Sequence, residues 1–81
     1  MKLPRDVSGA QLVKALAKLG YSVSRQAGSH VRLTCYQPTQ HHVTVPNHDE
    51  LRIGTLAAIL GDVAAHHGLS RDELIEKVFG R

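Results

Sequence analysis

The stretch Gly28-Ser29-His30-Val31-Arg32-Leu33 decides how the rest of this sequence is interpreted, because a glycine turn leads directly into a strand of alternating residues. Apolar and polar residues alternate from His30 to Tyr36, which predicts a strand with one face in a core and the other face open. A histidine at the start of such a strand can accept or donate a proton near neutral pH. The open face is therefore where we expect the chemistry.

Two neighbouring segments show the same period of two. Residues 21–26 precede a short hairpin connection, Ala27-Gly28-Ser29, and residues 41–45 follow a turn and stop at Pro46. Such short connections favour an antiparallel meander. The face of the first strand that is expected to be buried carries Tyr21, Val23 and Arg25. The open face of the three strands is expected to carry Ser22, Ser24, Gln26, His30, Arg32, Thr34, Tyr36, His42 and Thr44.

Three segments have helical spacing, and two of them begin with a capping box. Ser8 and Gln11 have the N-cap and N3 spacing at which each side chain bonds the other residue's backbone N–H. The pair Ser70 and Glu73 repeats this pattern. We therefore expect a first helix over about residues 9–19, ended by Gly20, and a short last helix that runs to about residue 79.

The middle helix is expected to begin near Gly54-Thr55 and to end at Gly68. Gly61 lies inside it and costs about 1 kcal/mol relative to alanine, so a break or kink is expected there. The resulting order, α-β-β-β-α-α, predicts an α+β fold with the helices packed on one face of a three-stranded antiparallel sheet. The other face of the sheet stays open.

Size and composition narrow the classes of function. With 81 residues the chain is expected to form a single domain, residues 1–81, and a net charge of +3 is a mild bias toward polyanionic partners. The absence of a run of about 18 apolar residues and of an apolar leader predicts a soluble, cytoplasmic protein with no membrane partner. Cys35 is the single cysteine, which excludes an internal disulfide and cysteine-based structural zinc sites, so we expect it in the core.

Two blocks of residues resemble the HicA toxins, the small RNA-cleaving halves of bacterial and archaeal toxin–antitoxin pairs. The first block is Gly28-Ser29-His30 leading into a strand. The second block comprises His42-Val43-Thr44-Val45-Pro46, His48, Leu51, Gly54-Thr55-Leu56 and Ile59-Leu60. Together with the opening helix and Gly20-Tyr21, the resemblance covers about Ser8 to Leu60.

The resemblance implies a fold similar to double-stranded RNA-binding domains. It also implies a metal-independent endoribonuclease, an mRNA interferase without cofactor, which acts on mRNA and is neutralised by a HicB-type antitoxin. The catalytic histidine of the family corresponds to His30. One departure is the helix start at Gly54-Thr55, which lacks the lysine cluster of ordinary double-stranded RNA binders and so does not favour binding across the grooves of a duplex.

The chemistry of RNA explains how these residues could act. RNA carries its own nucleophile, the 2′-hydroxyl, so cleavage needs a base for that proton and an acid for the leaving oxygen. His30 can serve as either group, and Arg32 can hold the scissile phosphate from the same strand face. Gly28 and Ser29 are predicted substrate contacts, although an ordinary hairpin glycine explains Gly28 equally well. Tyr36 could stack on a base, but surface packing explains it better.

The other histidines do not predict a metal site. They are His41, His42, His48, His66 and His67. No two of them form an i, i+4 pair on one helix and no cysteine is expected to join them, so the compact candidate is His48 with Asp49 and Glu50. By parity His42 shares the open face and is a candidate to assist His30, whereas His67 is expected to be partly buried and His48 to fix a loop.

Two other classes of function stay open. One is a non-catalytic RNA- or protein-binding module on the same fold, and the other is a metal-dependent hydrolase. Cleavage of RNA in the presence of a chelator would separate them from the ribonuclease. At the start of the middle helix, Gly54-Thr55 with Arg52 could bind a phosphate, but simple capping by Thr55 is the favoured interpretation.

Overall fold

Six regular elements and one short 3₁₀ turn make up the structure, a computed structural model that describes residues 3–80. They are α1 (Gly9–Leu16), which continues as η1 (Ala17–Leu19), β1 (Ser22–Ala27), β2 (His30–Cys35), β3 (His41–Pro46), α2 (Ile53–His67) and α3 (Arg71–Phe79). The three strands form an antiparallel sheet in the order β1-β2-β3. The predicted α+β order and the meander are both confirmed.

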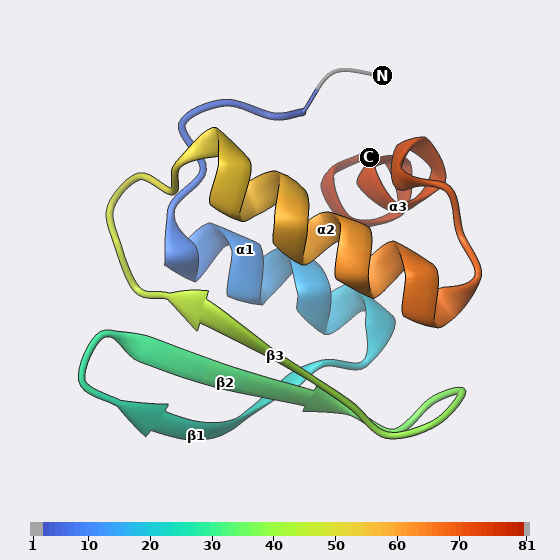
Figure 1. Cartoon of the computed structure of the whole chain (residues 1–81), viewed down its shortest axis with the longest axis horizontal. Helices are drawn as coiled ribbons and strands as arrows, with labels where there is room; N and C mark the ends of the chain where they lie inside the picture. Colours follow the sequence, from blue (N-terminus) through green and yellow to red (C-terminus); the bar gives the residue numbers. More distant parts are fainter. Residues whose placement is uncertain (1–2, 81) are drawn as a thin grey trace.

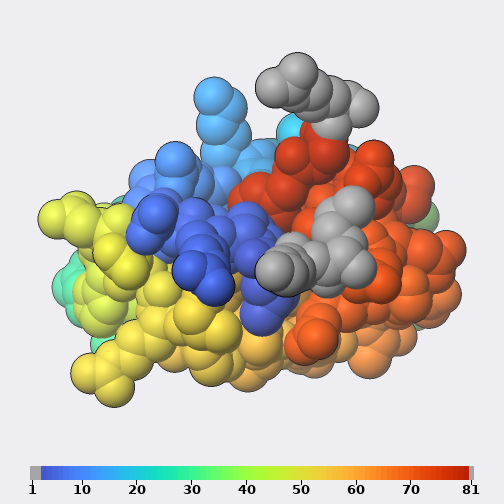
Figure 2. All heavy atoms as spheres, turned by 90° about the horizontal axis from the view of Figure 1, so that it is seen from above, coloured from blue at the N-terminus to red at the C-terminus, as the bar shows by residue number. Residues whose placement is uncertain are grey.

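The helices cover one face of the sheet. Figure 1 shows α1 and α2 side by side above the strands, with α3 packed beside α2. Seen from the helical side, the N-terminal segment, the connection before α2 and α3 hide most of the sheet (Figure 2). The core between the two layers is aliphatic, and each buried Leu or Val contributes roughly 1.5–3 kcal/mol to stability. Its most deeply buried apolar side chains are Leu12, Leu16, Leu33, Val45, Leu56, Leu60, Val63, Leu74 and Val78.

Both predicted capping boxes are present. The Ser8 hydroxyl accepts from the Gln11 backbone N–H at 3.0 Å, and the Gln11 side-chain oxygen accepts from the Ser8 N–H at 2.8 Å. The same reciprocal pair joins Ser70 and Glu73, at 3.1 and 2.9 Å. The first helix ends in η1 at Gly20, whose φ of 91° is left-handed, as its glycine predicted.

The middle helix differs from the prediction in two respects. It starts at Ile53 with Arg52 as its N-cap, and no side chain caps it, so the interpretation of Thr55 as the cap is wrong. The helix also runs through Gly61 as one α-helix, because the buried stripe on either side, which includes Leu60 and Val63, outweighs the low helix propensity of one exposed glycine. Among residues 3–80, no helix is both long and apolar enough to cross a membrane.

The edge strand β1 also departs from the prediction. Tyr21, just before it, is buried, but every residue of β1 is exposed, including Val23 at 52%, so the expected buried face is wrong for Val23 and Arg25. A β-bulge between Val23 and Arg25 shifts the register, so that Arg25 is paired with Arg32 and Gln26 with Val31. Gln26 therefore leaves the open face on which it was predicted, and Arg25 joins it.

Candidate functional site

A two-residue turn places His30 at one end of the open sheet face. Gly28 has a φ of +57° and, with Ser29, connects β1 to β2. A glycine with positive φ at the first central position is typical of a type II′ hairpin turn, whose twist suits the flanking strands. His30 is the first residue of β2 and is exposed, with Ala27 and Pro46 as its partners on the neighbouring strands. We call this region the hairpin end.

A row of polar residues crosses the sheet next to His30. Arg32 is paired with Arg25 on β1 and with Thr44 on β3, and all three are exposed. Residues directly opposite in a sheet project from the same face, and residues two apart along a strand do so as well. His30, Arg32 and Arg25 therefore share one surface. Sequence reasoning missed Arg25, because a bulge leaves no alternation signal of its own.

In the central part of the open face, polar side chains bond to one another. Thr34 was predicted on this face and lies there, but it is buried, with 1% of its surface exposed. Its hydroxyl oxygen lies 2.8 Å from Ser24 Oγ and 2.7 Å from His42 Nδ1. His42 is paired with Thr34, four residues along β3 from the partner of His30, or about 13 Å. This separation is too large for His42 to assist His30 at a single phosphate.

The connection between β3 and α2 is fixed through its main chain. The His48 carbonyl accepts from the Gly9 N–H at 2.9 Å, and the Asn47 N–H donates to the Ser29 carbonyl at 2.6 Å. A Cβ atom on Gly9 would lie 2.2 Å from the Pro46 oxygen, so only glycine allows α1 to approach this closely. This connection is therefore held beside the hairpin turn.

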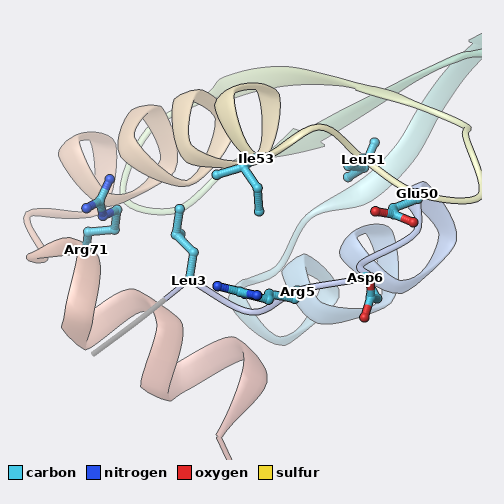
Figure 3. A pocket seen from close by; sticks show the side chains of 7 residues that line it. All are labelled: Leu3, Arg5, Asp6, Glu50, Leu51, Ile53 and Arg71. Carbon is cyan, nitrogen blue, oxygen red and sulfur yellow. The ribbon is translucent and has the colours of Figure 1, made fainter.

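Several candidate residues lie away from His30. Tyr36 follows the opposite end of β2 and is 66% exposed. Arg52 and Gly54 are exposed at the start of α2, on the helical layer. That side also has a hollow in which Leu3 and Ile53 point toward one another, and Arg5, Asp6, Glu50, Leu51 and Arg71 complete its lining (Figure 3). The hollow is not continuous with the polar face, because the core layer separates the helices from that face.

A second group of titratable side chains lies at the opposite end of the sheet from His30. We call it the histidine cluster, and it consists of Tyr21, Cys35, His41, His66 and His67. The Tyr21 hydroxyl lies 2.6 Å from His41 Nδ1 and 3.2 Å from His67 Nε2. The Cys35 sulfur is 3.8 Å from His67 Nε2, and the ring of His66 stacks on that of His41 with centroids 4.2 Å apart.

The expectation that no cysteine joins the histidines is wrong. Cys35 is fully buried, as predicted for a core residue, but its Cα partner on β3 is His41. The parity of the strands could have indicated this pairing, whereas the approach of His66 and His67 depends on how α2 crosses the sheet. Burial, the largest effect, lowers the pKa of His67, and the neighbouring His66 and His41 lower it further. Burial also raises the pKa of Tyr21 above its usual range.

Fold and site define a small α+β domain that presents an open, arginine-bearing sheet face with a histidine at one end. A family model described as the HicA toxin of bacterial toxin–antitoxin systems matches residues 9–64. The chain therefore belongs to the HicA toxin family, and this membership makes it a toxin component with an antitoxin as its partner. No curated protein and no solved structure matches it.

Proposed function

We propose that this toxin is a metal-independent endoribonuclease that cleaves mRNA, with His30 as its catalytic residue. Gly28, Ser29 and Arg32 bind the substrate beside it, and a HicB-type antitoxin neutralises the activity. The observation that carries the proposal is the exposed His30 at the hairpin end, on the same sheet face as Arg32 and Arg25. Family membership supports the toxin role, and the geometry supports the choice of residues.

The reaction follows from the chemistry of RNA. His30, in its neutral form, takes the proton of a 2′-hydroxyl, whose oxygen then attacks the adjacent phosphorus. The bond from phosphorus to the 5′-oxygen breaks, and that oxygen receives a proton from an acid or from water. The products are a 2′,3′-cyclic phosphate and a 5′-hydroxyl, so no hydrolytic water or metal is required for this step.

The arginine row supports an anionic ligand at this surface. Two like charges directly opposite one another on neighbouring strands are destabilising in the free protein. Arg25 and Arg32 are such a pair, and a phosphate between them would relieve their repulsion and accept charge-assisted hydrogen bonds. The same guanidinium groups would stabilise the charge that develops on phosphorus as the 2′-oxygen attacks.

The decisive experiment uses a short RNA that the protein cuts at one position, incubated with a chelator. A matched RNA with a single 2′-deoxynucleotide at that position should remain uncut, because the nucleophile is missing. His30→Ala should lower cleavage of the unmodified RNA by about 10² to 10⁴-fold, the usual contribution of a general base. His42→Ala, a histidine on the same face but too distant to act at the same phosphate, should cleave at the wild-type rate.

A non-catalytic RNA-binding module predicts a different result. The protein would then retain the RNA at low salt without producing new ends, and His30→Ala would change nothing. Cleavage of the 2′-deoxy RNA, or loss of all activity with chelator, would instead favour a metal-dependent hydrolase. A circular dichroism spectrum of each variant shows whether it is folded and serves as the control.

A further inference from the structure

We propose that the histidine cluster binds one transition-metal cation of the zinc class, with Cys35, His41 and His66 as its ligands. This site lies at the end of β2 opposite His30, about 17 Å along the strand. The proposed metal has one cysteine ligand and two histidines, so it differs from the zinc sites built on several cysteines that a single cysteine excludes, and it takes no part in RNA cleavage. The inference therefore does not rest on the proposed ribonuclease function.

The ligand atoms are already close to one another. One atom from each of Cys35, His41 and His66 lies within 4.8 Å of the other two. Zinc bonds of about 2.3 Å to sulfur and 2.0–2.1 Å to nitrogen place neighbouring ligands about 3.5 Å apart in a tetrahedral site. The remaining gap is about 1 Å, but the His66 ring lies nearly parallel to the His41 ring, at 11°, and an imidazole binds a metal in its own plane. His66, which is half-buried near the end of α2, must therefore turn about its side-chain bonds to direct a nitrogen at the metal, and this rotation also closes the gap.

The protein environment favours a cation at this place. His66 and His67 belong to the last turn of α2, whose unpaired carbonyl groups carry partial negative charge. The carboxylate of Asp62, one turn earlier, lies 3.3 Å from His41 Nε2. In the described part of the chain no lysine or arginine bonds to any member of the cluster. A bound cation would thus lie near the partial negative charge of the carbonyl groups at the end of α2 and near the negative charge of the Asp62 carboxylate.

The histidine ligands also have hydrogen-bond partners for the ring nitrogens that would not bind the metal. Zinc-binding histidines almost always bond a carboxylate, a backbone carbonyl or water through the second ring nitrogen, which sets the tautomer, and a hydroxyl oxygen can accept such a bond as water does. His41 has such a partner on either side, Tyr21 on Nδ1 and Asp62 on Nε2, so one remains whichever nitrogen binds the metal. His66 has the Thr39 carbonyl 3.0 Å from its Nε2, which leaves Nδ1 for the metal.

The donor set selects the kind of metal. A thiolate and two imidazoles suit zinc and similar borderline-soft ions, whereas magnesium and calcium require oxygen ligands. Binding replaces the thiol proton of Cys35 with the metal and releases that proton to solvent. With three protein ligands, water or the nearby His67 would occupy the fourth position, and the metal would join the end of α2 to β2 and β3.

Cobalt is the probe of choice, because its visible spectrum reports both geometry and a thiolate ligand. The full chain, reduced and freed of metal by chelator, is titrated with Co²⁺. We expect saturation at one equivalent per chain, intense tetrahedral bands and a thiolate-to-cobalt charge-transfer band, all of which one equivalent of Zn²⁺ should remove. Cys35→Ser should abolish the charge-transfer band, and His66→Ala should weaken Co²⁺ binding by at least about tenfold.

The matched control is His42→Ala. His42 neighbours His41 in sequence but projects from the opposite face of the sheet, so its loss should leave both the spectrum and the affinity unchanged. No charge-transfer band in the wild type would overturn the proposal, and so would equal losses in His42→Ala and His66→Ala. Because His66 is half-buried at a helix end, its variant tests the site even if Cys35→Ser fails to fold.

Discussion

The two ends of the sheet carry histidines with opposite surroundings, His30 at the start of β2 and His41 at the start of β3, beside Cys35. At the hairpin end, His30 is exposed and shares its surface with two arginines. At the other end, only 16% of the His41 side chain is exposed, and its two ring nitrogens face the hydroxyl of Tyr21 and the carboxylate of Asp62. An exposed imidazole can approach a substrate, whereas an imidazole with partners on both nitrogens is held in place. The same residue type is thus proposed to react with RNA at one end and to hold the fold or a metal at the other.

The largest expected effect is the loss of RNA cleavage when an arginine of the hairpin end is replaced. Arg32→Ala should lower kcat/KM for RNA cleavage by about 10²-fold, because the phosphate loses a charged donor in the transition state. Arg25→Ala should lower it by about tenfold, since Arg25 stands one strand further out. Neither variant should be less stable in urea, because each removes one of two opposed like charges.

The control for this pair is Arg71→Ala, which removes an arginine from the helical side, away from the polar face. It should cleave at the wild-type rate. If Arg71→Ala were as slow as Arg32→Ala, the effect would come from net charge, and the arginine row would lose its special role.

The second largest expected effect is a loss of stability at the end of the sheet that carries the histidine cluster. Tyr21→Phe should lower the free energy of unfolding by about 1–2 kcal/mol, because the His41 and His67 nitrogens lose the hydroxyl that lies between them. Tyr36→Phe makes the same chemical change at a residue that is 66% exposed and should stay within about 0.5 kcal/mol of the wild type. Urea denaturation in the presence of chelator measures both. Equal values for the two variants would contradict the cohesive role of the cluster.

A smaller change is expected at the turn of the hairpin end. Gly28→Ala should cost about 1 kcal/mol, because an alanine at a φ of +57° is strained even though no atom lies near its Cβ. Gly61→Ala, in the exposed interior of α2 with similar open space, should instead stabilise the protein by about 1 kcal/mol. Opposite signs in thermal or urea melts would confirm that backbone conformation distinguishes the two glycines. A stabilised Gly28→Ala variant would show that this φ is not required.

These two ends also show what the sequence can and cannot reveal. The capping boxes, Gly20 and the alternation of β2 are local patterns, so the order of elements and the position of His30 followed from short windows of sequence. The bulge that brings Arg25 beside Arg32 changes register without changing composition. The histidine cluster is still less accessible, because Cys35 and His66 are joined only by the crossing of α2 over the sheet.

The smallest expected effect concerns the capping boxes beside the two ends. The Ser8 box adjoins the hairpin end through Gly9, whereas the Ser70 box follows directly after the cluster end of α2. Only the second contains an acid: hydrogen bonds from the Ser70 backbone and hydroxyl lower the pKa of Glu73 from its ordinary value. A lowered pKa in the folded state stabilises the protein above the unfolded pKa, and this contribution is lost as the pH falls through the folded value. The urea midpoint should therefore fall less between pH 5 and pH 3 in Glu73→Gln than in the wild type. Gln11→Ala is the control: its midpoint should fall between these two pH values by as much as the wild-type midpoint does, because Gln11 does not titrate. An acid sensitivity that survives Glu73→Gln would place its origin outside the Ser70 capping box.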